Sequence, residues 1–416
     1  MTVRLLAAPA VDLISKSETK GEIPAASSCD PKPKSVKWAF PADYTFQSEH
    51  VRKLIVTVQE VSQSKVQLPK GRVAKCFLIA KIIGNLASYF FGCKQNQKSL
   101  SLHAATLLLH QRAWSLNHNA DDLKQLKNET HWKNTVYAPA PSLLPKARAD
   151  LFAAKEERLA QQVSITTPDK VMLDGIFFPT KSKHVILLAM GLTGMYEECA
   201  VDYVYKSYVS FFKKEFNNPN ILMVNTRGIN LSQGFTAPQT LQVDIFTAYQ
   251  FLVQHYGFDV EDVLVWGHSL GGCYGLQGAA LMQQEHPSKK ISAVVERTFL
   301  NLSEVAGTVF GAIICANGLE MCSKEAADQL KGSVVTIVSK QDTIIPYALS
   351  FAKKYKPKQN NFKIIELEDV PTITTKKAEK KATGLTMDDH HIRKFRPKEV
   401  EQITAAVKGI FDKNFS

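Results

Sequence analysis

Short apolar runs recur along the second half of the chain, and the segments between them have helical spacing. The runs are HVILLAM (184–190), NILMVNT (220–226), DVLVWG (262–267), ISAVVE (291–296), SVVTIVS (333–339) and FKIIEL (362–367), and the helical segments are 196–214, 240–256 and 269–285. Buried strands that alternate with helices are typical of a mostly parallel sheet with helices on both faces. The sequence therefore predicts a doubly wound α/β fold.

The pattern changes at about residue 161, where this domain is expected to begin. VSITTPDKVMLDGIFFP (163–179) alternates apolar and polar residues around Thr167-Pro168-Asp169, which predicts a β-hairpin at an antiparallel edge of the sheet. A last helix is expected at about 397–413. The chain then divides into an irregular segment rich in Pro, Ser and Lys (1–45), a helical N-terminal extension (46–160) and the α/β domain (161–416).

Charge and cysteine content narrow the classes of function. The formal net charge is +12, but neither zinc-finger spacing nor an RNP-like aromatic box accompanies it, so we expect no nucleic-acid partner. The 7 cysteines form no CxxC pair, which favours free thiols in a reducing compartment and hence a cytoplasmic protein. No metal and no cofactor is expected. Membrane association and delivery into a host cell stay open as alternative locations.

Residues 73–93, VAKCFLIAKIIGNLASYFFGC, form the most apolar stretch of the extension. A membrane-spanning helix needs about 20 largely apolar residues, and Lys81 near the middle would cost about 2.5–3.5 kcal/mol. We therefore expect an amphipathic helix that is buried or lies on a surface. Peripheral membrane contact through the basic or apolar N-terminal helices is one partner prediction.

The stretch DVLVWGHSLGGCYG (262–275) carries a buried strand into a Gly-x-Ser-x-Gly turn with a helix behind it. Such a turn holds its serine in a strained backbone at the carboxyl end of the sheet, near the positive end of the next helix. Ser269 is thus the candidate nucleophile, and the backbone N–H of Leu270 is a candidate oxyanion donor. His268 is expected to fill space. A glycine-rich turn for close helix packing is the alternative interpretation.

Two loops that follow other strands supply the remaining candidates. A second oxyanion N–H would come from Gly-Leu-Thr-Gly at 191–194, and we assign it to Leu192 with Thr193 in reserve. Asp342 follows the strand at 333–339 by a few residues, where a carboxylate can hold a histidine in the required tautomer. The alternative for Asp342 is a helix cap or turn residue.

The base must follow the acid in the order Ser, Asp, His, and only two of the 11 histidines do so. His390 and His391 lie between the last predicted strand and the last helix. Because neighbours in an extended segment point to opposite sides, only one of them can face the serine. If Ile392 packs inward, His390 shares its side, so we favour His390 and keep His391 as the alternate.

These motifs together resemble the α/β-hydrolase superfamily over about residues 160–416. The likeness is carried by TRGINLSQG (226–234), GHSLGG, SKQDTIIP and DDHHI, and it is closest to compact serine hydrolases of the serine-aminopeptidase-like and abhydrolase-domain branches. Met190, where many members have His, and Asn230 depart from the pattern. The helical extension is similar to that of uncharacterised CHLPS-type and SidB-like hydrolases of intracellular bacteria.

The resemblance and the candidate residues together imply a serine hydrolase that cleaves carboxylic esters or thioesters through an acyl-enzyme on Ser269, of the carboxylesterase or lipase type. The expected partner is an acyl ester or thioester, including a lipid or an acylated protein. A serine peptidase acting on short peptides and a non-catalytic host-interaction scaffold remain alternatives.

Overall fold

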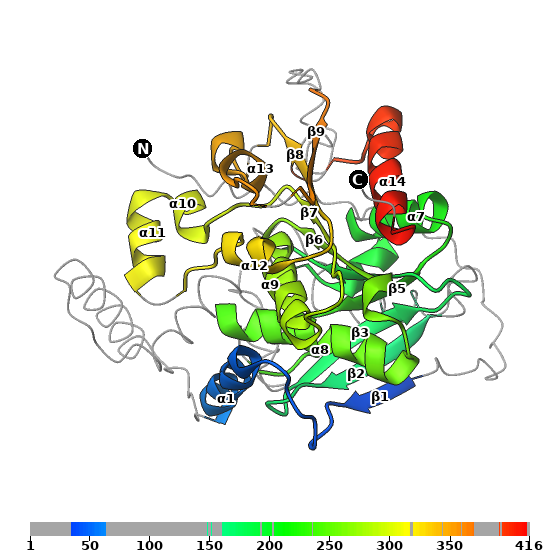
Figure 1. The fold of residues 1–416 in the computed structure, drawn as a ribbon, viewed down its shortest axis with the longest axis vertical. Helices are drawn as coiled ribbons and strands as arrows, with labels where there is room; N and C mark the ends of the chain where they lie inside the picture. The colour runs from blue at the N-terminus through cyan, green and yellow to red at the C-terminus, as the bar shows by residue number, and fades with distance from the viewer. Residues whose placement is uncertain are drawn as a thin grey trace, which may run out of the picture.

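The computed structural model describes residues 35–63, 148, 151, 160–191, 194–201, 204–234, 236–316, 319–342, 344–358, 360–369, 391 and 393–413. Within these residues a nine-stranded sheet forms the centre of the molecule, in the order β1-β2-β3-β5-β4-β6-β7-β8-β9 (Figure 1). The strands are β1 (Ser35–Ala39), β2 (Gln161–Thr166), β3 (Met172–Phe178), β4 (Val185–Ala189), β5 (Asn220–Val224), β6 (Val263–His268), β7 (Ala293–Glu296), β8 (Val334–Ser339) and β9 (Phe362–Leu367).

Most neighbouring strands are parallel, as the alternation of apolar runs and helices predicted. β4 pairs in parallel with β5 and β6, and the parallel pairing continues through β7 and β8 to β9. β3 is antiparallel to both β2 and β5, so the predicted hairpin is present. The carboxyl ends of the parallel strands therefore meet at one edge of the sheet, where the sequence predicted the site.

Helices cover both faces of the sheet. One face carries α1 (Glu49–Gln63), α8 (Pro238–Tyr256), α9 (Leu270–Glu285), α12 (Lys324–Gln329) and α13 (Phe351–Lys354); the other carries the 3-10 helix η4 (Tyr196–Val201), α7 (Val204–Glu215) and α14 (Pro397–Phe411). Further short helices are η5 (Val260–Asp262), α10 (Leu302–Val305), α11 (Gly307–Ala316) and η6 (Tyr347–Leu349).

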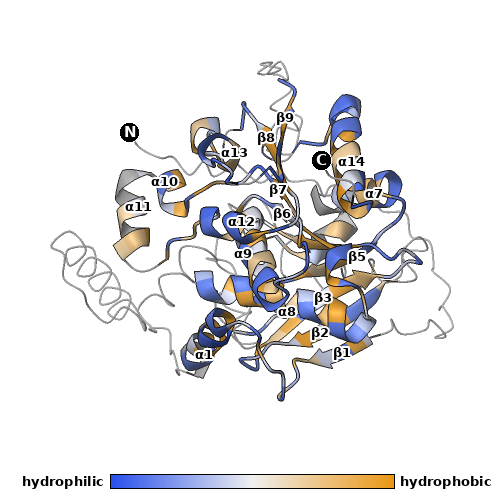
Figure 2. Ribbon diagram, in the orientation of Figure 1, coloured by the Kyte–Doolittle hydropathy of each residue, from blue (hydrophilic) through white to orange (hydrophobic). Residues whose placement is uncertain are grey.

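The alternation of side chains along β4 shows how one strand serves both cores. Val185 and Leu187 belong to the core under α8 and α9, whereas Ile186 and Leu188 belong to the core under α7 and α14. All four side chains are 0 % exposed. Figure 2 shows orange along β2, β3 and β8 and much of α1 in blue, as expected for a buried sheet under a helix with one solvent-facing side.

The N-terminal region differs from the expectation. Residues 1–45 were predicted to be irregular, but Ser35–Ala39 form β1, which pairs in parallel with β2 and so makes the hairpin an inner part of the sheet. The prediction was wrong here because β1 has only five residues, with exposed Ser35, Lys37 and Ala39 on one side and half-buried Val36 and Trp38 on the other. So short a strand shows little pattern of its own.

Residues 46–63 are likewise part of the α/β domain and not of a separate extension. The buried carboxylate of Glu285, at the end of α9, accepts hydrogen bonds at 2.9 Å from the backbone N–H groups of Gln47 and Ser48. The hydroxyl of Tyr44 donates to the same carboxylate at 3.2 Å. The first turn of α1 is thereby fastened to α9, and α1 covers α8.

The predicted apolar helix at 73–93 lies outside the described residues. Among the helices that are described, none is both long and apolar enough to cross a membrane.

Candidate active site

The turn between β6 and α9 has the geometry that its sequence predicted. Ser269 lies between the last residue of β6 and the first residue of α9, with φ 55° and ψ −125°. Every residue from 262 to 276 is buried except Ser269, which is half-exposed. A backbone in this sparsely populated region costs on the order of 1–3 kcal/mol and presents the hydroxyl at the carboxyl end of the sheet.

Two glycines make this turn possible. A β-carbon on Gly267 would lie 2.4 Å from the carbonyl oxygen of Gly271. A β-carbon on Gly271 would lie 2.1 Å from the carbonyl oxygen of Ala189, at the end of β4. Both distances are far inside van der Waals contact, so the close approach of β4, β6 and α9 requires glycine at these positions.

Ser269, His391 and Asp342 form a hydrogen-bonded series at this edge of the sheet. The Oγ of Ser269 lies 2.9 Å from Nε2 of His391. Nδ1 of the same ring lies 2.9 Å from Oδ2 of Asp342. With the proton on Nδ1, the ring donates to the carboxylate and accepts from the serine hydroxyl.

The Asp342 carboxylate is itself held by the loop that follows β8. Its Oδ1 accepts hydrogen bonds from the backbone N–H groups of Ile344 at 2.9 Å and Ile345 at 2.8 Å. Asp342 and His391 are 7 % and 6 % exposed. The carboxylate is thus oriented with Oδ2 toward the imidazole.

The preference for His390 is corrected by this geometry, because the ring between Ser269 and Asp342 is that of the alternate, His391. His390 lies outside the described residues. The preference assumed that an apolar side chain sets the inward direction of the segment. Instead His391 and Arg393, two residues apart, are both buried. The charge of Arg393 is neutralised by the carboxylate of Glu399 in α14, to which it donates at 2.5 Å.

The loop after β4, the candidate oxyanion loop, lies against α9. Gly194 N–H donates to the carbonyl oxygen of Gly191 at 3.0 Å, which closes a turn. The hydroxyl of Tyr274 in α9 donates to the carbonyl oxygen of Met190. Leu192 and Thr193, the predicted donors, lie outside the described residues, whereas Leu270 begins α9 directly behind Ser269.

His268 does more than fill space. Its Nε2 lies 3.0 Å from the carbonyl oxygen of His391. Since a carbonyl can only accept, Nε2 carries the proton and donates. Burial, helped by the neighbouring His391, holds the pKa of His268 well below its ordinary value of 6.5, so the ring is neutral. Its place next to the serine was the only sequence signal for this contact.

The sequence did not predict a buried hydrogen-bond network around Arg148. Arg148 donates to Asp174 at 2.7 Å and also to Glu197, and these two carboxylates are 2 % and 0 % exposed. Tyr196 donates to Asp174 at 2.9 Å, and Asn225 donates to Glu197 at 3.0 Å. Arg148 thereby holds η4, the segment that follows the candidate oxyanion loop. Nothing in the pattern around Arg148 predicts this, because its partners come from β3 and η4, far along the chain.

Arg227, the arginine of the TRGINLSQG segment, forms buried ion pairs that stabilise the fold. Arg227 is 1 % exposed and donates to Asp169 at 2.7 Å and to Asp244 at 2.8 Å. It ties the turn of the hairpin to α8 and does not contact Ser269, His391 or Asp342 through any of these bonds.

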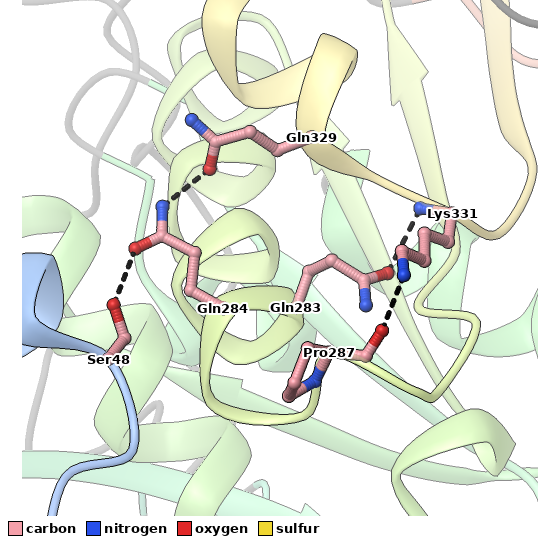
Figure 3. A pocket seen from close by; sticks show the side chains of 6 residues that line it. All are labelled: Ser48, Gln283, Gln284, Pro287, Gln329 and Lys331. Atoms are coloured by element: carbon pink, nitrogen blue, oxygen red, sulfur yellow. Dashed lines mark hydrogen bonds between the residues drawn. The ribbon is translucent and has the colours of Figure 1, made fainter.

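A cavity of about 510 Å³ lies elsewhere, at the far end of α9 (Figure 3). It is lined by Ser48, Gln283, Gln284, Pro287, Gln329 and Lys331. Gln283 stands 14 residues after Ser269, so at 1.5 Å per residue the cavity is about 20 Å from the serine along the helix. The side-chain amide of Gln284 accepts a hydrogen bond from the Ser48 hydroxyl and donates one to Gln329, so it is hydrogen-bonded to other residues of the cavity wall. This cavity is not the candidate active site.

The mostly parallel sheet covered by helices on both faces, with a strand–serine–helix turn at its carboxyl edge, defines an α/β-hydrolase fold, and two sequence relatives support the α/β-hydrolase superfamily. The narrower resemblance to compact serine hydrolases and to CHLPS-type proteins stays a prediction.

Comparison with known proteins agrees with this class. The chain is 25 % identical over 229 residues to the protein bem46 of Schizosaccharomyces pombe, covering 51 % of this chain and 71 % of that protein. It is 29 % identical over 90 residues to the alpha/beta hydrolase domain-containing protein WAV2 of Arabidopsis thaliana, covering 22 % of this chain and 28 % of that protein. No protein-family model matches.

Among solved structures, the chain is similar to an esterase of Pyrococcus furiosus with a TM-score of 0.44 and 16 % identity, covering 68 % of this chain and 96 % of that one. WAV2 is named as an alpha/beta hydrolase domain-containing protein, which agrees with the fold of this chain.

Proposed function

We propose that the protein is a serine hydrolase that cleaves carboxylic esters or thioesters through an acyl-enzyme on Ser269. The observation that carries the proposal is the hydrogen-bonded series from Ser269 Oγ through His391 to Asp342, with 2.9 Å at each link. Because the sequence analysis placed the base at His390, the proposal moves that role to His391.

The chemical steps follow from these contacts. Ser269 Oγ attacks the acyl carbon while its proton passes to Nε2 of His391. The negative charge on the acyl oxygen is held by the Leu270 N–H at the positive end of α9, and by the amide predicted at Leu192. The imidazolium, stabilised by Asp342, gives its proton to the leaving alkoxide or thiolate. Water then adds to the acyl-enzyme by the same route and releases the acid.

Exposed apolar side chains beside the site support an acyl group as the substrate. Ile344 is 51 % exposed in the loop that carries Asp342, and Leu231 is 49 % exposed in the loop after β5. β5 and β8 stand on opposite sides of β6, so the two side chains come from loops that flank the serine turn. An apolar acyl chain would cover such side chains on binding.

The alternatives have less support. A peptidase needs a group for the peptide amine, and the buried carboxylates of Asp174 and Glu197 already bind Arg148. A purely non-catalytic scaffold has no use for the aligned Ser269, His391 and Asp342. Membrane contact and cellular location stay predictions, since the apolar helix expected at 73–93 lies outside the described residues.

The test is the Ser269→Ala variant, assayed on a panel of p-nitrophenyl esters, thioesters and aminoacyl amides. We expect turnover of esters or thioesters to fall at least about 10³-fold and labelling by a fluorophosphonate probe to disappear. Ser164→Ala is the matched control, because it removes a half-buried hydroxyl on β2, four strands away. Wild-type turnover by Ser269→Ala would refute the proposal.

A further inference from the structure

The segment that carries His391 is held by two buried donors from the ends of neighbouring strands. His268, one residue before Ser269, donates to the carbonyl oxygen of His391 at 3.0 Å. Arg297, directly after β7, donates to the carbonyl oxygen of Arg393 at 2.9 Å. We propose that His268 and Arg297 are positioning residues that fix the catalytic base through the backbone of its own segment. This inference rests on the proposed function.

The first donor is fixed by its surroundings. His268 is 4 % exposed, and its ring centroid lies 5.1 Å from that of His391 and 5.9 Å from that of Tyr208. Its backbone belongs to β6 and is paired with Glu296 of β7. A packed ring on a central strand can keep its N–H in one place, which a side chain on a surface loop cannot do.

The second donor is fixed by an ion pair. Arg297 is 1 % exposed, has φ 48° and is paired with the carboxylate of Glu296. The other oxygen of Glu296 accepts from Tyr208 at 2.6 Å and from Trp266 at 3.2 Å. The Arg297 guanidinium also lies 5.4 Å from the ring centroid of Phe395. These contacts hold one end of the guanidinium while the other end reaches the Arg393 carbonyl.

The same segment is fastened on its other side by Arg393. This side chain donates to Glu399 of α14 at 2.5 and 2.8 Å and to the carbonyl oxygen of Glu368 at 3.0 Å. The backbone around His391 is therefore held from β6, from β7 and from α14. The elements that hold it include the strand that ends at the nucleophile.

This arrangement matters because one imidazole ring must keep two 2.9 Å contacts at once, to Ser269 and to Asp342. A displacement of about 1 Å in such a site can lower the rate about 10²-fold. Fixing the backbone carbonyl of the base removes the displacement that would break both contacts together. Neither His268 nor Arg297 needs to contact the substrate for this role.

The experiment compares three substitutions of His268 on the full-length chain. His268→Gln keeps an N–H donor three bonds from Cβ, where the His Nε2 stands; His268→Asn keeps the amide but is one bond shorter; His268→Met fills similar space without a donor. His184→Met is the matched control, because His184 is half-buried at the opposite, amino end of β4. Rates are measured per mole of folded protein, with kcat, KM, melting temperature and the pH profile of kcat/KM.

We expect His268→Met and His268→Asn to lower kcat about 10–100-fold with KM changed less than about threefold, and His268→Gln to stay within about threefold of wild type. The shape of the pH profile of kcat/KM should change in the two impaired variants and stay as in wild type in His268→Gln, because a purely structural loss would lower the rate without changing that shape. Should His268→Met fail to fold, the difference between Gln and Asn still decides.

Arg297 is tested by Arg297→Lys, which keeps a cation beside Glu296 but lacks the second nitrogen that reaches Arg393. We expect a kcat loss of about tenfold, and a loss in His268→Met/Arg297→Lys smaller than the product of the two single losses, since both donors act on one segment.

Three results would overturn the inference: equal losses in the Gln, Asn and Met variants of His268, unchanged kcat in His268→Met, or a loss of the same size in His184→Met. Failure of the proposed function is distinguished by Ser269→Ala, which would then keep its activity, whereas failure of the positioning role leaves Ser269→Ala inactive.

Discussion

Gly271 in the first turn of α9 stands so close to Ala189 at the end of β4 that a β-carbon would approach its carbonyl oxygen to 2.1 Å. The candidate oxyanion loop begins immediately after Ala189, so this approach sets the distance between that loop and Ser269. One position therefore couples the packing of the sheet to the geometry of the candidate site.

We predict that Gly271→Ala lowers ester hydrolysis at least about 100-fold, because the added methyl group must push β4 away from α9. Fluorophosphonate labelling and hydrolysis rates measure the effect. Gly275→Ala is the matched control: its β-carbon would meet the Ala189 side chain at 3.1 Å, one turn further along the same helix. A larger loss in Gly275→Ala than in Gly271→Ala would contradict this account.

The two adjacent histidines make a second prediction. His391→Ala should lower kcat/KM by about 10³-fold or more, since it removes the ring that lies 2.9 Å from both Ser269 and Asp342. His390→Ala should change kcat/KM less than about tenfold, a barrier change near 1.4 kcal/mol. Steady-state kinetics on one ester substrate decides the ranking, and the reverse ranking would return the role to His390.

The buried His268 predicts a specific loss of stability in acid. Burial lowers its pKa well below 6.5 in the folded protein, while the unfolded chain takes up a proton near pH 6.5. The unfolded state then binds more protons between these two values. The stabilisation is thus fully present above about pH 6.5 and is lost as the pH falls, at up to about 1.4 kcal/mol per pH unit.

Replacing His268 shows how much of the pH dependence of the free energy of unfolding comes from this side chain. In His268→Gln, the free energy of unfolding, measured in urea at pH 7, 6 and 5, should fall less steeply with acidification than in wild type. Asp174 and Glu197, whose pKa values are raised by burial, act in the opposite sense but are common to both proteins. His255→Gln, at an exposed position, is the control and should follow wild type. Parallel curves for all three proteins would exclude this source of acid sensitivity.

The packing of α1 predicts that the N-terminal region stabilises the whole domain. Ile55 is 3 % exposed in the core with α8, so Ile55→Ala should cost about 2–5 kcal/mol. Val56, its neighbour, is 47 % exposed, and Val56→Ala should stay within about 0.5 kcal/mol of wild type. Urea unfolding of the two variants measures the difference. Equal stabilities would mean that residues 46–63 are a separate module, as the sequence first indicated.

The central strands could be predicted because each is apolar on both faces. The run at 184–190 contains the whole of β4, and the run at 262–267 differs from β6 by one residue at each end. Ser269 and Asp342 followed from the same logic, since each stands just after such a strand. The local sequence pattern is therefore sufficient to predict a strand that helices bury on both faces.

The errors arose where a contact depends on distant parts of the chain. β1 shows little apolar pattern because only one side of it packs, against elements more than 100 residues away. The choice of His391 over His390 depends on Arg393, a charged residue that is buried only because Glu399 compensates it. Neither the packing of β1 nor the pairing of Arg393 with Glu399 can be recognised from a few neighbouring residues.

The bond between Tyr44 and Glu285 spans 241 residues, and it has a consequence for synthesis on the ribosome. Translation proceeds from the N-terminus at about 5–20 residues per second, so Tyr44 emerges roughly 10–50 s before its partner exists. Until α8 and α9 have emerged, the apolar side of α1 has no helix to cover it. The first described elements of the chain therefore make their final contacts only late in synthesis.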